Sequence, residues 1–256
     1  MSFRAATGAV LAAALLLTES CGGGSSPPRA AQSNGQIDLT GGARSTASEE
    51  PAAQDSASTT NGAVIRFEDL PVTRLDKKRV PLPNAANPSL GAESAPVVVQ
   101  LWSDFECPFC ANVHPVLTEM LRVYAGKVRL VWHDYPLPFH AHARLAANAG
   151  REAYAQGGAA SFWRFHDAVY GSPVAVLTAG NLERFASKQG LDPARFHESL
   201  TSLRHNGEID QDVHSGDSVG VEGTPAFLIN DYFFVGAVPF EILRVILDRA
   251  LSDAGA

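Results

Sequence analysis

The segment that decides the fold of this chain runs from Val97 to Cys110 and reads VVVQLWSDFECPFC. Its first six residues form a short apolar run rich in β-branched side chains, which indicates a buried strand. Two cysteines follow at C-x-x-C spacing, and a helical pattern comes after them. A strand that turns into a helix places Cys107 beside unpaired backbone N–H groups, where the helix dipole favours a thiolate. The segment therefore predicts a thiol redox centre, with Cys107 as the nucleophile and Cys110 as the resolving cysteine.

The same C-x-x-C spacing also occurs in metal sites, haem attachment sites and structural disulfides. Haem attachment needs a histidine after the second cysteine, and Ala111 stands there. The chain has only three cysteines, so a four-cysteine zinc site is excluded. An inert disulfide stays open, although a bridge across two residues stabilises little. A Cys2His2 zinc site also stays open, without the histidine spacing of a zinc finger, and its candidate ligands are His114, His133, His140 and His142.

A second informative stretch runs from Gly220 to Asn230 and reads GVEGTPAFLIN. Pro225 opens the apolar run of this stretch, and proline cannot donate a hydrogen bond to a strand ladder. A proline at that position marks the start of a strand, an edge strand or a cis bond in a tight turn. An ordinary turn proline is the alternative.

The predicted order of elements resembles the thioredoxin fold: a strand, the C-P-F-C motif, a helix, a second strand and a distant hairpin that opens with T-P. The resemblance covers the chain from near Val80 to the C-terminus. Within it, the phrase SDFECPFC resembles the DsbA-like group of extracytoplasmic thiol-disulfide oxidoreductases. The resemblance implies that the Thr224-Pro225 bond is cis and that Pro225 lies against the sulfurs as a third catalytic residue. It also implies that clients bind along the Thr224 backbone, with Pro108 and Phe109 beside it.

The remaining pattern predicts the fold class. Amphipathic helices are indicated around Leu182 to Ala186 and around Phe196 to Leu203, and Asp192-Pro193 is a helix start. We expect an α/β thioredoxin-like fold, a small mixed sheet flanked by helices. The block at about 139–216 is too long for a loop and predicts an inserted helical domain.

The N-terminus predicts where the protein is located. Residues 5–17 form an apolar run that suits a signal peptide, and Cys21 follows in a context similar to a bacterial lipoprotein signal. We expect a signal peptide at 1–21 with Cys21 lipidated, a disordered linker at 22–62 and the DsbA-like domain at 63–256. A soluble secreted product cleaved nearby and an uncleaved anchor are the alternatives. The prediction is an extracytoplasmic protein, in the periplasm or cell envelope, held to the membrane by a lipid.

We therefore predict an enzyme that exchanges disulfides with exported protein clients, with a membrane or periplasmic redox partner. Its only cofactor would be the Cys107–Cys110 disulfide, and no metal is expected. The net charge of −7 and the lack of a basic run predict no nucleic-acid partner. The sequence favours an oxidase over a reductase or isomerase with the same residues. The alternative from another class of function is a lipoprotein that is redox-inactive or holds a metal ion and that binds a partner.

Several residues near the motif affect the expected chemistry. Phe109 stands where strongly oxidising relatives have histidine, which predicts a less oxidising pair. Asp104 and Glu106 are expected to raise the pKa of the Cys107 thiol by charge repulsion. Many thioredoxin-like proteins place a proton-accepting carboxylate near the position of Gln100. Here either Glu106 or water replaces that group, or resolution by the second thiol is slower, or Gln100 merely fills a strand position. Five histidines are predicted to be surface or capping residues rather than catalytic ones: His114, His133, His140, His142 and His166. His133 is the best candidate if one of them is catalytic.

Overall fold

The computed structural model describes residues 58–60, 63–172 and 177–256. The predicted signal peptide, Cys21 and nearly all of the predicted linker lie outside the described residues. Within the described part of the chain, no helix is both long enough and apolar enough to cross a membrane. The elements, in chain order, are β1 (Ser58–Thr60), β2 (Ala63–Ile65), η1 (Phe67–Asp69), β3 (Thr73–Arg74), η2 (Lys77–Arg79), β4 (Ser89–Leu90), β5 (Val97–Ser103), α1 (Pro108–Val123), β6 (Val128–Asp134), α2 (Ala143–Tyr170), α3 (Ala179–Lys188), α4 (Pro193–Ser202), α5 (Asn206–Val219), β7 (Ala226–Ile229), β8 (Tyr232–Val235) and α6 (Phe240–Ala254).

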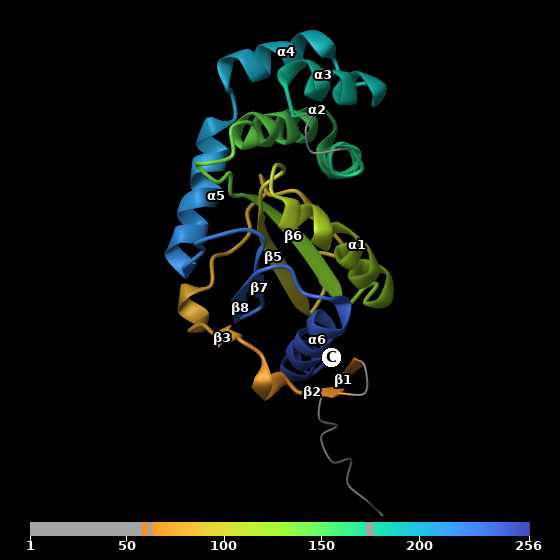
Figure 1. Cartoon of the computed structure of the whole chain (residues 1–256), viewed down its shortest axis with the longest axis vertical. Coiled ribbons are helices and arrows are strands. Elements are labelled where there is room, and N and C mark those ends of the chain that lie inside the picture. Colours follow the sequence, from red (N-terminus) through yellow and green to blue (C-terminus); the bar gives the residue numbers. More distant parts are fainter. Residues whose placement is uncertain (1–57, 61–62, 173–176) are drawn as a thin grey trace, which may run out of the picture. The chain divides into compact units, whose positions relative to one another are not determined.

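A mixed sheet of order β3-β8-β7-β5-β6-β4 forms the centre of the fold (Figure 1). β5 and β6 pair in parallel, so their carboxyl ends lie at the same edge of the sheet. β7 pairs antiparallel with β5, which brings the start of β7 to that same edge. This topology places the residues after β5, the residues after β6 and the residues before β7 close together, although they are far apart in sequence.

Helices cover both faces of the sheet. α1 and α6 pack on one face, where the main core includes Val99 and Leu101 of β5 together with Leu117 of α1. α5 lies on the other side of the sheet, where a smaller core is built around Trp102 and Leu228. Alternate residues of β5 therefore belong to different cores, as the two-residue period of a strand requires.

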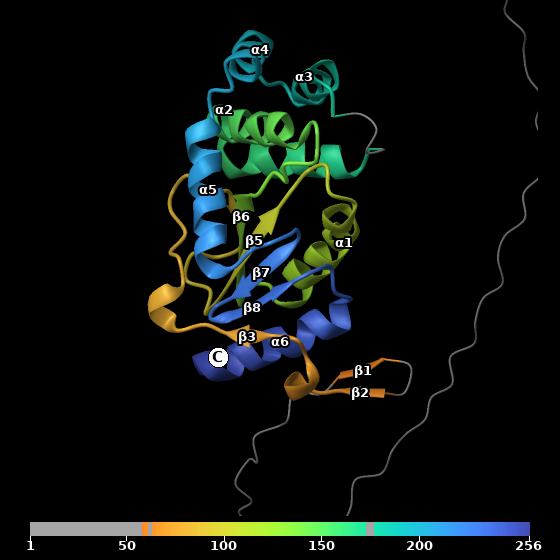
Figure 2. The ribbon, with the colours of Figure 1, turned by 60° about the vertical axis from the view of Figure 1, so that its left-hand side comes forward.

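Between β6 and β7 the described chain is helical, from Ala143 in α2 to Val219 in α5. Figure 2 shows α2, α3 and α4 gathered at one end of the sheet, with α5 running back along it. α2 is interrupted at Gly157 and Gly158, because Gly158 has φ 66° and ψ −163°, a conformation open to glycine. The helical block predicted from the sequence is present, and the predicted order of strands and helices is confirmed.

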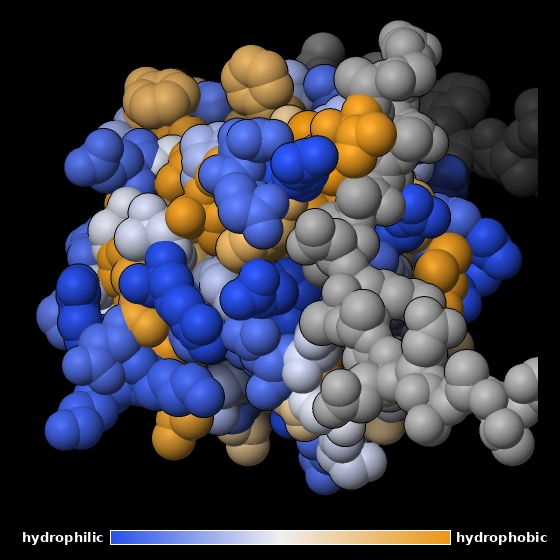
Figure 3. Space-filling view, turned by 90° about the horizontal axis from the view of Figure 1, so that it is seen from below, coloured by the Kyte–Doolittle hydropathy of each residue, from blue (hydrophilic) through white to orange (hydrophobic). Residues whose placement is uncertain are grey.

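The surface at the α6 end of the molecule is mixed. Figure 3 looks onto this end, and polar side chains dominate the part drawn in colour, with smaller groups of apolar residues between them.

Candidate active site

Cys107 lies at the start of α1 as its N-cap residue, directly after the turn that follows β5. The turn is held by Asp104, whose carbonyl accepts from the Cys107 N–H at 3.0 Å and whose side chain accepts from the Glu106 N–H at 2.8 Å. Pro108 occupies the first helical position, where a missing N–H has no cost. The local sequence therefore builds the strand-turn-helix corner that its pattern predicts, and both cysteines are buried.

The Thr224-Pro225 peptide bond is cis. The Cys107 Sγ lies 3.3 Å from the Thr224 carbonyl oxygen, so the turn before β7 contacts the first cysteine directly. The pairing of Trp102 with Ala226 in the β5–β7 ladder brings these two segments together. The structure thus brings the turn that contains Thr224 and the cis Pro225 to Cys107, at the edge of the sheet where β5 ends.

The two cysteines are unpaired thiols, and their pKa values shift in opposite directions. A hydrogen bond from Cys110, together with the backbone N–H groups of Phe109 and Cys110, lowers the pKa of the Cys107 thiol to about 5, although burial opposes the shift. Burial raises the pKa of the Cys110 thiol well above its ordinary value, and the negative charge of Cys107 adds to this. The arrangement therefore holds a thiolate on the first sulfur and a neutral thiol on the second.

The carboxylates next to the motif were expected to raise the pKa of the Cys107 thiol, but the net shift of that pKa is downward. Asp104 is buried, and its second oxygen accepts from the Leu137 N–H at 2.9 Å and contacts His140 Nδ1 at 2.7 Å. Glu106 accepts from the His142 N–H at 2.6 Å and contacts the His142 ring at 3.3 Å. Both carboxylates are thus held by donors from the 137–142 segment, and the pKa of Cys107 is lowered rather than raised.

Sequence reasoning missed Ser103 and Tyr170. The Tyr170 hydroxyl donates to the Asp104 carbonyl at 3.1 Å and lies 3.2 Å from Ser103 Oγ. Ser103, the last residue of β5, also lowers the pKa of the Cys110 thiol by hydrogen bonding, although burial dominates that thiol. No sequence signal pairs these residues, because Tyr170 comes from the far end of α2, 67 positions away.

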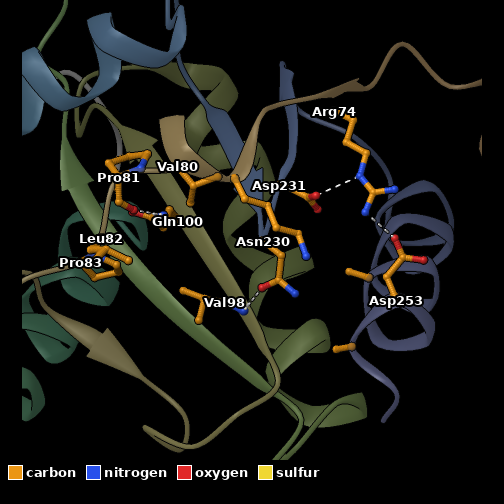
Figure 4. Close-up of a pocket in the computed structure, with 13 residues that line it drawn as sticks. Arg74, Val80, Pro81, Leu82, Pro83, Val98, Gln100, Asn230, Asp231 and Asp253 are labelled. Atoms are coloured by element: carbon orange, nitrogen blue, oxygen red, sulfur yellow. Dashed lines mark hydrogen bonds and ion pairs between the residues drawn. The ribbon is translucent and has the colours of Figure 1, made fainter.

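Gln100 does not lie beneath the cysteines. Its amide nitrogen donates to the Pro81 carbonyl at 2.8 Å, and its amide oxygen lies 3.0 Å from His133 Nε2. Gln100 instead lines a pocket of about 350 Å³, with Val98, Asn230 and Asp253 among its other walls (Figure 4). The neighbouring Leu101 is buried in the core against α1, so no carboxylate of β5 takes the proton-accepting place.

The predicted surface location is wrong for two of the histidines, because His133 and His166 are buried. His133 stacks on Trp102, 4.7 Å between ring centroids, on the sheet face opposite α1. It contacts Asp212 of α5 at 3.0 Å. His133 therefore belongs to a polar network that joins β6 to α5 rather than to the thiol site.

No described cysteine takes part in a metal-binding cluster. Within the described residues, a search for three or more such ligands finds His114, His166 and Asp167, and neither cysteine is in this group. The Cys2His2 site that the sequence left open is therefore not formed by the described residues.

The predicted client-binding residues lie around the first cysteine. Phe109 is 59% exposed, although it lies between two buried cysteines, while Thr224 is almost fully buried. Phe139, on the segment that contacts Asp104 and Glu106, is 76% exposed. Two large apolar side chains are therefore open to solvent, one in the first turn of α1 and one on the loop that follows β6.

Comparisons with known proteins agree with this geometry. A family model described as Thioredoxin matches residues 84–249. The chain is 37% identical over 165 residues to the Na(+)/H(+) antiporter NhaA 3 of Salinispora tropica, covering 64% of this chain and 24% of that protein. It thus spans about a quarter of that relative's length.

Two further relatives match over most of their own length. The chain is 28% identical to a probable disulfide bond formation protein D of Bacillus anthracis, covering 64% of this chain and 78% of that protein. The crystal structure of Pseudomonas aeruginosa DsbA2 superposes with a TM-score of 0.55 at 26% identity, covering 68% of this chain and 98% of that one. These matches confirm the thioredoxin-like fold predicted from the sequence. The family model covers well over half of the chain, and the chain therefore belongs to the thioredoxin family.

Proposed function

We propose that this protein oxidises exported client proteins outside the cytoplasm by exchanging a disulfide between Cys107 and Cys110. The observation that carries the proposal is the pair of opposite pKa shifts beside a cis proline. A thiol with a pKa of about 5 is a good leaving group, and a good leaving group favours transfer of the disulfide to the client.

The proposed reaction begins with the Cys107–Cys110 disulfide. A client thiolate attacks Cys107, forming a mixed disulfide, and Cys110 leaves and takes up a proton because its pKa is high. A second client thiolate then attacks the client sulfur and displaces Cys107 as a thiolate. The client gains one disulfide, the protein gains two electrons, and a redox partner must reoxidise it.

Client binding is proposed on the surface around Cys107. Phe109 and Phe139 offer exposed apolar area, and Pro108 and the Thr224 backbone lie next to the reactive sulfur. An extended client segment beside Thr224 would place a cysteine against Cys107.

The first test is trapping with a disulfide-bonded client such as insulin. Cys110→Ser should accumulate a mixed disulfide at Cys107, because the resolving thiol is missing. Cys107→Ser, the matched control, should accumulate none. Equal trapping by the two variants, or trapping by neither, would contradict the assigned roles.

The second test decides the direction of the reaction. The redox potential of Cys107–Cys110, measured in glutathione buffers, should lie between about −120 and −180 mV for a disulfide donor. A potential near about −270 mV would identify a reductase instead.

Location and anchoring belong to the same proposal. The domain would begin near residue 63, after a linker that follows a lipidated Cys21. Cys21→Ser should release the protein from the membrane fraction, and Cys107→Ser should not. Equal membrane association of both variants would contradict lipidation at Cys21.

A further inference from the structure

Two histidines and one aspartate meet beside α1, outside the thiol chemistry described above. His114 comes from α1, one turn after Cys110, while His166 and Asp167 come from the last part of α2. His114 Nε2 and His166 Nδ1 lie 3.0 and 2.9 Å from the same oxygen, Oδ1 of Asp167. All three atoms lie within 4.8 Å of one another.

This donor set has the chemistry of a transition-metal site. Imidazole nitrogen and carboxylate oxygen are ordinary ligands of Zn²⁺, at bond lengths near 2.0 to 2.2 Å. In a tetrahedral site with such bonds, neighbouring ligand atoms are roughly 3.3 Å apart. The two nitrogen-oxygen distances already approach that spacing. We propose that His114, His166 and Asp167 bind one divalent late first-row transition-metal ion, with Zn²⁺ as the reference ion.

The side chains around the site support entry of an ion from solvent. The side chains of Asp167 and His114 are 62% and 28% exposed, so one side of the cluster is open to water. His166 is buried among aromatic rings, including those of Trp132 and Trp163 at centroid distances of 5.1 and 4.9 Å. One ligand is therefore held rigidly, and the open side leaves a fourth position for water.

The His166 ring faces Asp167 with Nδ1, while its far nitrogen, Nε2, is buried. A metal ion on Nδ1 would replace the hydrogen bond to Asp167 at that nitrogen and leave the ring proton on Nε2, which has no hydrogen-bond partner among the described residues.

The competing interpretation is a hydrogen-bond cluster in which Asp167 simply accepts from both rings. The two interpretations differ in what Zn²⁺ does, so the test adds the ion directly. Because reduced cysteines bind zinc themselves, the test uses the full chain with Cys21, Cys107 and Cys110 replaced by serine. The outcome then does not depend on thiol exchange, and a failure here would leave the proposed redox function untouched.

Isothermal titration of this protein with Zn²⁺ at pH 7.5 should show one site. His114→Ala and Asp167→Asn should each weaken binding by at least about tenfold, because each removes a direct ligand. His197→Ala is the matched control, since His197 pairs with Glu183 at 2.8 Å and belongs to no three-ligand cluster of described residues. It should leave Zn²⁺ affinity unchanged.

The visible absorption of bound Co²⁺ provides a second measurement, because it reports the metal ligands directly rather than the stability of the fold. The parent protein should show the visible absorption of tetrahedral Co²⁺, and His114→Ala should lose it while keeping its circular dichroism. Absence of stoichiometric Zn²⁺ binding by the parent would overturn the proposal. Binding that survives both His114→Ala and Asp167→Asn would also overturn it.

Discussion

Cys107 and Cys110 have identical side chains three positions apart, but their surroundings differentiate them. Cys107 lies at the N-terminus of α1, where it receives hydrogen bonds from Cys110 and from backbone N–H groups. Cys110 lies one turn inside, where burial dominates and raises its pKa. The attacking and resolving roles proposed for the two sulfurs therefore follow from their positions on one helix end.

The lowered pKa of Cys107 predicts how the stability of the reduced protein depends on pH. Between about pH 5 and the ordinary thiol pKa near 9, Cys107 is ionised when folded and protonated when unfolded. The unfolded state binds more protons in this window, so the free energy of unfolding of the reduced protein should rise with pH and should fall as pH drops towards 5. The oxidised protein lacks this thiol, so its free energy of unfolding should not show this dependence on pH.

Two measurements check this prediction. Thermal unfolding of the reduced and oxidised forms from pH 5 to 8 should show the melting-temperature difference, reduced minus oxidised, increasing with pH. The rate of iodoacetamide alkylation of Cys107 should follow a titration near pH 5. An alkylation midpoint near pH 8.5 would contradict the lowered pKa.

At the scale of elements, the break inside α2 depends on the backbone of Gly158. Its φ of 66° and ψ of −163° are costly for any residue with a Cβ atom, although no neighbouring atom would obstruct that Cβ. Gly158→Ala should therefore lower the free energy of unfolding by about 1–3 kcal/mol.

A helical glycine in an equally open setting provides the control for Gly158. Gly180 lies in α3 with free space around its Cβ position. Gly180→Ala should raise the free energy of unfolding by about 0.5–1 kcal/mol in the same urea titration. The same sign of change in both variants would show that backbone conformation is not the cause.

The start of α4 shows a helix end that the sequence specifies. Asp192 caps it, accepting from the Ala194 and Arg195 N–H groups at 2.9 and 3.1 Å. Asp192→Ala should lower the free energy of unfolding by about 1 kcal/mol, measured by urea denaturation.

The cap of α3 is the comparison for Asp192. Thr178 holds the same position there but makes no side-chain cap hydrogen bond. Thr178→Ala should therefore cost clearly less than Asp192→Ala. Equal losses would mean that the Asp192 cap bonds contribute little.

At the scale of the whole molecule, a buried ionic network joins the helical block to the sheet. Arg151 of α2 binds both Asp134 of β6 and Asp212 of α5, and all three side chains are almost fully buried. Arg151→Met would leave two carboxylates buried without their cation, so it should lower the free energy of unfolding by about 3–5 kcal/mol.

An exposed ion pair between the same two helices is the matched control for Arg151. Arg144 of α2 reaches Asp210 of α5, but their side chains are 42% and 63% exposed. Arg144→Met should cost at most about 1 kcal/mol in the same urea titration. A small loss for Arg151→Met would mean that the helical block is held to the sheet mainly by apolar packing.

Much of this protein could be predicted from local sequence. The apolar run before Cys107, the proline after it and the Asp192-Pro193 pair each act within a few residues, and the structure contains the elements they predict. Local sequence also indicated the proline that opens β7, while its cis bond was implied by the family resemblance. Charges were harder to interpret, because Asp104 and Glu106 are adjacent to the motif in sequence but are held by donors of the 137–142 segment.

By itself, the sequence determined the redox motif, the order of strands and helices and the membership of the thioredoxin family. The tertiary structure alone decided which face of β5 packs against α1. It placed Leu101 in the core on that face and Gln100 on the other face. It also brought Tyr170 to Ser103, and His114 to Asp167. The physical reason is that the last two contacts join residues more than 50 positions apart, and only the packing of α1 and α2 around the sheet sets their distance.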